Sequence, residues 1–289
     1  MARILITGAH GMLGEDLQRV LIEHDVTAFG RGDLDITNEA AVRSAVNDYD
    51  AVINAAAYTA VDNAETDEDA ALLINGTGPT NLARATRLSG AKLVQISTDY
   101  VFDGSATTPY AENTPHAPIS AYGRTKAAGE KGVLTEHPDG SYIVRTAWLY
   151  GQNGANFAQT MLNLAAKLDT FTVVDDQFGQ PTWTRDLASQ IALLIDSDAA
   201  PGIYHGTNSG KTSWRGFAQA VLSEAGLDPA RVHPTDSASF VRPAPRPSYS
   251  VLGHDAWVAA GLPPMRPWRE ALHAAFEADT FTLTPSKEQ

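Results

Sequence analysis

The chain has 289 residues, 43% hydrophobic and 19% charged, an ordinary composition for a globular protein with one large core or two modest ones. It contains no cysteine, which excludes disulfides, thiolate metal sites and a cysteine nucleophile and is typical of a reducing cytoplasm, where we expect the protein to act. The formal net charge of −13 repels phosphate backbones, so nucleic acid is not an expected partner. No apolar run reaches the roughly 18 residues that span a bilayer, and the first residues enter a strand and a Gly-rich turn rather than a signal peptide. We therefore expect no membrane partner.

The first half of the chain alternates short apolar runs with helical periodicity. The runs at 3–7, 26–29, 51–54, 92–96 and 141–145 are typical of buried parallel strands. The segments between them at 12–23, 38–47, 67–88 and 121–136 are typical of helices. This alternation predicts an α/β fold with a doubly wound, Rossmann-like parallel sheet, in which residues 1–146 form a dinucleotide-binding domain. The carboxyl ends of such strands meet at one edge of the sheet, where ligands bind.

The second half is less regular. Helical periodicity recurs at 157–168, 185–195, 214–225 and 268–278, with short strands at 171–174 and 203–205 and Pro-rich connections at 241–247 and 262–264. We interpret residues 147–289 mainly as a smaller mixed α/β lobe that binds substrate, with some later segments expected to return to the first domain.

A Gly-x-x-Gly-x-x-Gly pattern follows the first predicted strand and opens the first predicted helix. Gly8 permits a tight turn, Gly11 lets the backbone approach a pyrophosphate, and Gly14 lets helix and strand pack closely. A helix N-terminus supplies free N–H groups and a positive dipole end for phosphate. The pattern therefore predicts a dinucleotide site, which the turn residues His10, Met12 and Leu13 are expected to line.

The second strand determines how the ribose of the cofactor is held. It ends in Gly30-Arg31, with no carboxylate where NAD-binding proteins hold the ribose 2′-hydroxyl. Arg31 can instead pair with a 2′-phosphate, which favours NADPH and leaves NADH possible, or it can be an ordinary surface arginine. Asp35 is a candidate for binding the adenine amino group, with Ile36 against the ring, or it can be a solvated acid near the next helix. The third strand leads into Ala55, Ala56 and Ala57, small residues that let a cofactor lie against the backbone.

Tyr122 and Lys126 lie four residues apart in a predicted helix, so the phenol and the ammonium share one face. The lysine is expected to lower the tyrosine pKa and to bind the nicotinamide ribose, and such a tyrosine can protonate a carbonyl oxygen as hydride reaches the carbon. The fourth strand ends in Ser97-Thr98 at the ligand edge, and Thr98 can align the carbonyl oxygen. Tyr122 and Lys126 thus belong to both the cofactor and the catalytic sets.

Together these segments resemble the extended short-chain dehydrogenase/reductases, and within them the dTDP-4-dehydrorhamnose reductase family, over nearly the whole chain. The segments that carry the resemblance are Asn-Ala-Ala-Ala-Tyr-Thr-Ala-Val-Asp (54–62), Ala-Glu (64–65), Ser-Thr-Asp-Tyr-Val-Phe (97–102), Tyr-Gly-Arg-Thr-Lys-Ala-Ala-Gly-Glu (122–130), Arg-Thr-Ala-Trp-Leu-Tyr (145–150), Asn-Phe (156–157) and Asp-Gln-Phe-Gly-Gln-Pro-Thr (176–182). The resemblance implies reduction of the 4-keto group of dTDP-4-dehydro-6-deoxy-L-lyxo-hexulose, with Thr98, Tyr122 and Lys126 as the catalytic set. It also implies substrate contacts beyond Thr98 and Tyr122, from Val61, Asp62, Tyr100, Trp148 and Asn156. Arg242 and Arg246 are candidates for the substrate diphosphate, or loop arginines that cover apolar surface.

One departure from the pattern of the family's dehydratases narrows the range of expected reactions. Dehydratases of this family carry an Asp-Glu pair after the threonine, whereas this chain has Asp99-Tyr100, which disfavours water elimination. No His pair or acidic cluster has metal-ligand spacing, so no metal is expected. Two alternatives stay open, a reductase or epimerase of another activated keto-sugar and a regulatory subunit that binds a dinucleotide without catalysis. A monomer or a homodimer is expected.

Overall fold

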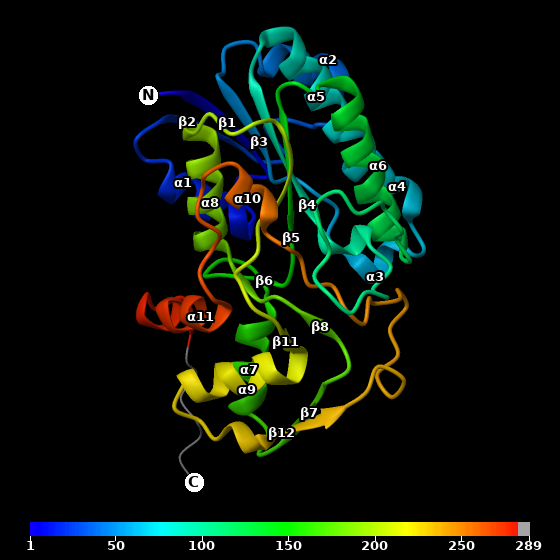
Figure 1. Cartoon of the computed structure of the whole chain (residues 1–289), viewed down its shortest axis with the longest axis vertical. Coiled ribbons are helices and arrows are strands. Elements are labelled where there is room, and N and C mark those ends of the chain that lie inside the picture. The colour runs from blue at the N-terminus through cyan, green and yellow to red at the C-terminus, as the bar shows by residue number, and fades with distance from the viewer. Residues whose placement is uncertain (283–289) are drawn as a thin grey trace.

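A computed structural model describes residues 1–282 and shows two lobes, a large one built on a sheet and a smaller one beneath it (Figure 1). Residues 283–289 of the predicted smaller lobe lie outside the described part. None of the described helices has the length and apolarity that crossing a membrane would require.

The large lobe contains one six-stranded sheet in the order β10-β5-β4-β3-β1-β2, with every neighbouring pair parallel. The chain runs outward from β1 to β2 and then returns to the other side of β1 at β3, which creates the topological switch point where α/β sheets bind ligands. The doubly wound Rossmann-like prediction is confirmed. The strands are β1 (Arg3–Thr7), β2 (Asp25–Phe29), β3 (Ala51–Asn54), β4 (Lys92–Thr98), β5 (Ser141–Thr146) and β10 (Gly202–His205).

Alternate residues of each strand fill two cores, one on each face of the sheet. In β1, Ile4 and Ile6 face α1 (Met12–Val20), α8 (Thr184–Asp196) and α10 (Asp255–Ala259), while Leu5 faces the opposite core. That second core is covered by α2 (Glu39–Ala45), α5 (Gly78–Ser89) and α6 (Ala121–Glu136). The segments that form α8, β10 and α10 therefore lie in the large lobe although they come late in the chain.

The segment predicted as one helix at 67–88 is interrupted, so that prediction is wrong in its continuity. It forms α4 (Glu68–Leu72), a π-helical turn η1 (Leu73–Thr77) and then α5. Side-chain hydrogen bonds explain the interruption, because the buried Asn75 amide bonds both backbone groups of Tyr58 and the Thr125 hydroxyl. Pro79 near the start of α5 marks a fresh helix N-terminus. The short helix α3 (Val61–Ala64) precedes this region.

The smaller lobe packs three helices around an aromatic-rich core that includes Tyr150, Phe217 and Trp268. Its helices are α7 (Phe157–Ala165), α9 (Trp214–Glu224) and α11 (Trp268–Glu277). Its strands pair in twos, β6 (Leu149–Tyr150) with β9 (Thr182–Trp183), β7 (Phe171–Val174) with β12 (Val232–Thr235), and β8 (Phe178–Gly179) with β11 (Thr212–Ser213). Single 3₁₀ turns occur at η2 (Asp99–Val101) and η3 (Pro229–Arg231).

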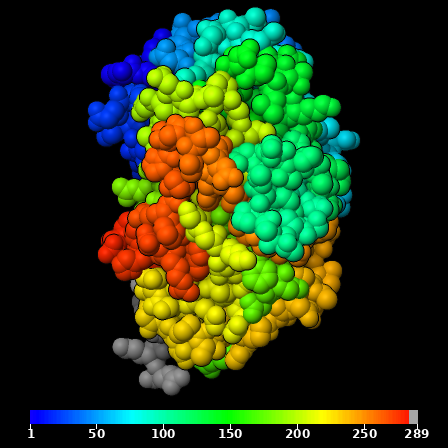
Figure 2. Space-filling model, viewed as in Figure 1, coloured from blue at the N-terminus to red at the C-terminus, as the bar shows by residue number. Residues whose placement is uncertain are grey.

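The segment that returns from the smaller lobe after β12 packs against the segment that follows β4. After β12 the chain runs back from the smaller lobe to the large one, where it forms α10 (Figure 1). On the face shown in Figure 2, the orange segment around α10 and the teal segment that follows β4 lie side by side. Backbone hydrogen bonds from Tyr110 N to Val251 O and from Gly253 N to Tyr110 O hold them together. The strand edge that carries the predicted site residues thus lies at the junction between the two lobes.

Candidate active site

The turn after β1 has the shape that binds a pyrophosphate. Gly8 adopts a φ of +71°, and a Cβ built there would lie 2.5 Å from the backbone nitrogen of Ala56. A Cβ at Gly14 would collide with the carbonyl oxygen of Gly8. Gly11 starts α1 without a side-chain cap, so the first N–H groups of the helix stay available for an anion. This cradle of backbone against backbone fits a dinucleotide.

The adenosine end of the predicted cofactor site is more open. Arg31 is exposed in the loop after β2, and the His10 ring lies against Gly30, so the phosphate turn and the arginine loop are neighbours. The Asp35 carboxylate accepts hydrogen bonds from the backbone N–H and the hydroxyl of Thr37, which lowers its pKa, with Arg31 adding to the effect. The Ile36 side chain is buried in the core beside α5 and is committed to packing.

Helix α6 brings Tyr122 and Lys126 against the end of β4. The helix begins where the Ser120 hydroxyl accepts from Gly123 N–H, and the Lys126 ammonium donates to the carbonyl oxygen of Ile96 at 2.7 Å. Thr98 is the last residue of β4, and its hydroxyl is close enough to Tyr122 to affect the phenol pKa. All three side chains of the predicted catalytic set are therefore buried together at the strand edge.

Glycines on α6 allow this close approach. A Cβ at Gly123 would collide with the carbonyl oxygen of Tyr100, and one at Gly129 with that of Asn75. The backbone of η2 and of the π-helical turn can therefore touch the helix directly, and the N–H of Ala121 is fixed by the Glu65 carboxylate at 2.8 Å. The small residues in the sequence after Tyr122 are thus a packing requirement.

The pKa values of the site differ from the expectation that Lys126 lowers that of Tyr122. Burial raises the pKa of the Tyr122 phenol above its usual range, although the Thr98 hydroxyl lowers it in part and the Asp99 charge raises it further. Burial also lowers the pKa of Lys126 to about 8, against the opposing charge of Glu130. Desolvation is larger than the pairwise charge effects because both groups are enclosed. The phenol is thereby kept protonated, which suits a proton donor.

A second buried acid lies next to this set. Thr98 Oγ1 donates to Asp99 Oδ1 at 3.0 Å and accepts from Tyr100 N–H at 3.2 Å. Burial raises the pKa of Asp99 to about 6, although the nearby Ser250 and Thr98 hydroxyls lower it in part. The carboxyl thus helps to orient the Thr98 hydroxyl.

The predicted substrate residues of the large lobe are gathered around Tyr122. Tyr100 lies edge-on to the Tyr122 ring with centroids 5.5 Å apart, and Val61 packs in the same cluster. Arg246 lies over the Tyr100 ring at 5.9 Å and forms an ion pair with Asp62 at 2.9 Å. The loop that carries Arg246 therefore reaches the catalytic set from the smaller-lobe side.

Asp62 holds this loop at three points. Besides Arg246, its carboxylate accepts from the N–H of Ala244 at 3.2 Å and lies 3.7 Å from the Arg242 guanidinium. The two arginines predicted to bind a diphosphate are thus paired with a carboxylate here. Arg242 is the more exposed of the two, with 53% of its side chain accessible against 19% for Arg246.

Trp148 and Asn156 occupy the smaller lobe. Trp148 has a φ of +47° and stacks on Trp214 with centroids 3.5 Å apart, above Gly179. The Asn156 side chain accepts from Gln159 N–H as the cap of α7 and donates to Gly151 O, so this amide is committed to the backbone. Sequence reasoning missed Trp214, whose position at the start of a helix gives no hint of a stacking partner.

Sequence reasoning also missed Glu130, a fully buried carboxylate one helical turn beyond Lys126. The spacing of Tyr122, Lys126 and Glu130 at i, i+4 and i+8 was the available signal. Across residues 1–282, no group of three or more His, Asp or Glu side chains is arranged to hold a metal ion.

Comparison with known proteins gives consistent findings over the whole fold. A family model described as the RmlD substrate binding domain matches residues 2–281. The chain is similar to the dTDP-4-dehydrorhamnose reductase of Streptomyces griseus, 53% identical over 284 residues that cover 96% of this chain and 93% of the relative. It is also similar to the dTDP-4-keto-6-deoxy-D-glucose reductase of Streptomyces niveus, 49% identical over 278 residues that cover 95% of this chain and 96% of the relative. Among solved structures it resembles the dTDP-4-dehydrorhamnose reductase of Bacillus anthracis in complex with NADP, with 41% identity, a TM-score of 0.92 and coverage of 96% and 99%.

Proposed function

The chain belongs to the RmlD substrate binding domain family, and from that premise we propose that it reduces the 4-keto group of dTDP-4-dehydro-6-deoxy-L-lyxo-hexulose to give dTDP-L-rhamnose. The observation that carries the proposal is the burial of Thr98, Tyr122 and Lys126 together at the strand edge that also holds the Gly8 turn. A carbonyl reductase needs a proton donor, a group that aligns the oxygen and a cation at one point, and this edge supplies all three.

A nicotinamide dinucleotide supplies the hydride when it is bound. The residues that would hold its pyrophosphate are Gly8, Gly11 and the first N–H groups of α1, at Met12 and Leu13. Ala55, Ala56 and Ala57 would lie beneath it, since Gly8 already touches the backbone of Ala55 and Ala56. We assign NADPH as the cofactor because Arg31 is exposed beside the phosphate turn, where it can meet a 2′-phosphate that NADH lacks.

Tyr122 gives its proton to the keto oxygen. Its raised pKa keeps the phenol protonated until negative charge develops on that oxygen. Thr98 aligns the oxygen when its hydroxyl, which donates to Asp99 Oδ1 in this structure, rotates to donate its one proton to the keto oxygen instead. Lys126 supplies positive charge on the same helix face, which stabilises the phenolate left behind. Positioned acid catalysis of this kind contributes roughly 10²- to 10⁴-fold.

Substrate is held by the loop around Arg246. The dTDP diphosphate carries negative charge that can replace the Asp62 carboxylate as the partner of Arg242 and Arg246. Val61 and Tyr100 would then border the sugar beside Tyr122, and Trp148, on its strained backbone, would border the opposite side. We give Asn156 only a supporting role, because its amide caps α7.

A second candidate is a reductase of a related dTDP-activated keto-sugar. It is favoured by the 49% identity to a relative named as a dTDP-4-keto-6-deoxy-D-glucose reductase, which is close to the 53% identity to the rhamnose-type relative. Fold and catalytic set would be the same, and only the sugar contacts would differ. The third possibility, a regulatory subunit, has no use for the buried Thr98, Tyr122 and Lys126.

The test is a coupled assay that follows NADPH and NADH oxidation with both dTDP-keto-sugars, using Tyr122→Phe as the inactive control. We expect turnover with the rhamnose precursor and faster reaction with NADPH. Turnover of the other sugar alone would move the assignment to the second candidate. Cofactor binding without oxidation of either cofactor would refute the enzyme assignment. We further propose that the protein acts in the cytoplasm, as a monomer or a homodimer.

A further inference from the structure

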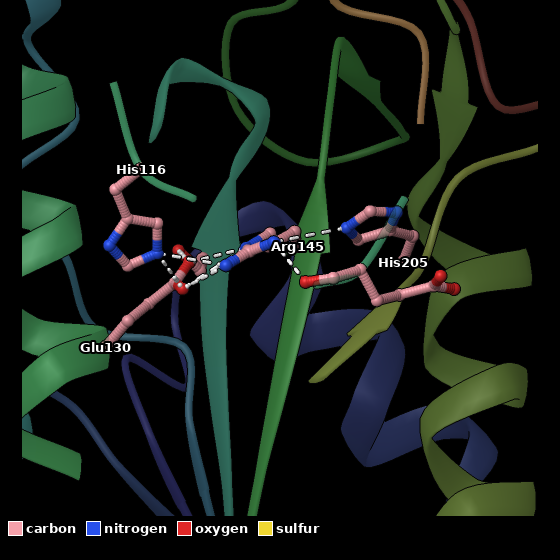
Figure 3. Close-up of polar contacts among 6 residues, drawn as sticks. His116, Glu130, Arg145 and His205 are labelled. Carbon is pink, nitrogen blue, oxygen red and sulfur yellow. Dashed lines mark hydrogen bonds and ion pairs between the residues drawn. The ribbon is translucent and has the colours of Figure 1, made fainter. Parts of the chain in front are cut away.

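A buried ion pair lies directly behind the catalytic set. Glu130 of α6 and Arg145 of β5 point toward one another, and His116 and His205 flank them (Figure 3). Arg145 Nη2 donates to Glu130 Oε2 at 2.7 Å and Nε donates to Oε1 at 3.0 Å, with both side chains almost completely inaccessible. Because desolvation makes such pairs a poor source of stability, their position in the fold calls for another explanation.

The pair is connected to the end of β4 through Ser97. The Ser97 hydroxyl donates to Glu130 Oε1 at 2.5 Å, and Ser97 is also the neighbour of Arg145 in the sheet register. Ser97 stands between Ile96, whose carbonyl oxygen accepts from Lys126, and Thr98, which lies beside Tyr122. Three successive residues of β4 therefore each lie against a different residue of α6. The three residues of α6, at positions 122, 126 and 130, follow one another at intervals of one helical turn.

All three guanidinium nitrogens of Arg145 make polar contacts, which restrict the movement of the ion pair. Its Nη1 donates to the carbonyl oxygen of Glu112 at 3.1 Å and contacts His205 Nε2 at 3.4 Å. Burial lowers the pKa of His205 to about 3, and its Nδ1 contacts Gly253 O, so Nε2 is the accepting nitrogen of a neutral ring. The network thus joins β4, β5, β10, α6 and the connection before α6 (Figure 3).

We propose that Glu130 is a positioning residue for the reduction, which acts with Arg145 to hold Ser97 and thereby places Thr98 against Tyr122 and Lys126. The inference rests on the proposed function, because it concerns the geometry of that reaction. An apolar residue at 130 could fill the same space but would leave the Ser97 hydroxyl and the Arg145 guanidinium without their acceptor. The Glu130 charge also favours the ammonium form of Lys126 against the effect of burial.

The test uses Ser97→Ala, which removes the connection to β4 and leaves the ion pair intact. Ser141→Ala is the matched control, since Ser141 is a fully buried serine of the same sheet, at the start of β5, whose hydroxyl has no partner among the described residues. We expect Ser97→Ala to lower kcat by about 10- to 100-fold, with KM for NADPH unchanged, because misplaced reacting groups slow the chemical step. Ser97→Thr retains the hydroxyl and should recover most of kcat. Ser141→Ala should match the wild type.

A second comparison separates positioning from stability. Glu130→Gln keeps the shape of the side chain and should lower kcat as well, whereas Val133→Ala, one turn further along α6 in the apolar core, should lower Tm and leave kcat unchanged. If Glu130→Gln does not fold, Ser97→Ala still decides. A kcat for Ser97→Ala equal to that of Ser141→Ala would overturn the proposal.

Amide hydrogen exchange of residues 98–101 provides a readout that does not depend on the substrate. We expect faster exchange there in Ser97→Ala than in Ser141→Ala, since the end of β4 loses its anchor. Equal exchange in the two variants would overturn the positioning role even if the substrate assignment were wrong. An inactive wild type with faster exchange in Ser97→Ala would instead refute the proposed function and leave the structural connection supported.

Discussion

The Lys126 ammonium donates a hydrogen bond to the carbonyl oxygen of Ile96 at 2.7 Å, inside the protein and one helical turn from Tyr122. Burial lowers the pKa of Lys126 to about 8, so the charge that the site requires is lost in a mildly alkaline range. Tyr122 does not titrate in the same range, because burial raises its pKa instead. The alkaline behaviour of the enzyme should therefore report on the lysine.

We accordingly expect kcat to fall as the pH rises through about 8, measured at saturating NADPH. Stability should change in the opposite direction. Between about pH 8 and the ordinary lysine pKa near 10.4, the unfolded chain binds a proton that the folded chain does not. The free energy of unfolding therefore increases with pH over this range. Lys126→Met should remove this gain in urea titrations at pH 7.5 and about 10. An identical pH trend in wild type and variant would contradict the assignment.

Tyr122→Phe should leave the fold and NADPH affinity intact and reduce kcat by about 10²- to 10⁴-fold, because only the proton donor is removed. Tyr142→Phe is a matched control at the far end of β5, where the hydroxyl donates to the carbonyl oxygen of Ala199. It should retain turnover. Steady-state kinetics and cofactor titration of both variants provide the comparison, and near-normal turnover of Tyr122→Phe would exclude the phenol as the donor.

Gly8→Ala should destabilise the protein by about 3 kcal/mol or more, for two reasons. The backbone at Gly8 is left-handed, which disfavours any residue with a Cβ, and the new Cβ would also overlap the backbone of Ala56. Gly90→Ala separates the two effects. Gly90 has a φ of +81° at the end of α5 but open space around it, so only the backbone penalty of about 1–2 kcal/mol applies. Urea unfolding of both variants tests this order, and equal losses would show that the turn can relax away from Ala56.

The local parts of the fold were predictable because they depend on periodicity along the chain. Helix α6 and strand β7 have the predicted bounds, and the phosphate turn follows from the glycine spacing together with its position between the first strand and the first helix. The interruption of 67–88 was not predictable, because the π-helical turn depends on Asn75 bonding Tyr58 and Thr125. Such contacts arise only after the helices pack.

The catalytic set could be predicted because it too depends on spacing along the chain. The pKa shifts of its residues could not be predicted. Tyr122 and Lys126 share a helix face by spacing, whereas the direction of the Tyr122 pKa shift depends on how completely the site is enclosed. The pairing of Asp62 with Arg246 joins α3 to the segment that returns from the smaller lobe, and no pattern in either segment specifies it.

Arg31→Ala should weaken NADPH binding by roughly 10- to 100-fold and leave NADH binding nearly unchanged, because a charge-assisted hydrogen bond to a 2′-phosphate is worth about 1.5–3 kcal/mol. Arg43→Ala, which removes an exposed arginine from α2, controls for the change in net charge. Binding titrations with each cofactor measure the difference. Equal losses for NADPH and NADH would show that Arg31 does not contact the phosphate.

Arg246→Ala should raise the KM for the dTDP-sugar by roughly 10- to 100-fold and leave NADPH binding unchanged, since the loop loses the cation that lies over Tyr100. Arg242→Ala should have a smaller effect, because that side chain is more exposed and 3.7 Å from Asp62, where solvent screens its charge. Competition by dTDP measured in both variants removes any influence of the chemical step. If both variants bind dTDP as the wild type does, the two arginines serve only to hold their loop on Asp62, and the diphosphate must be held elsewhere at the junction between the two lobes.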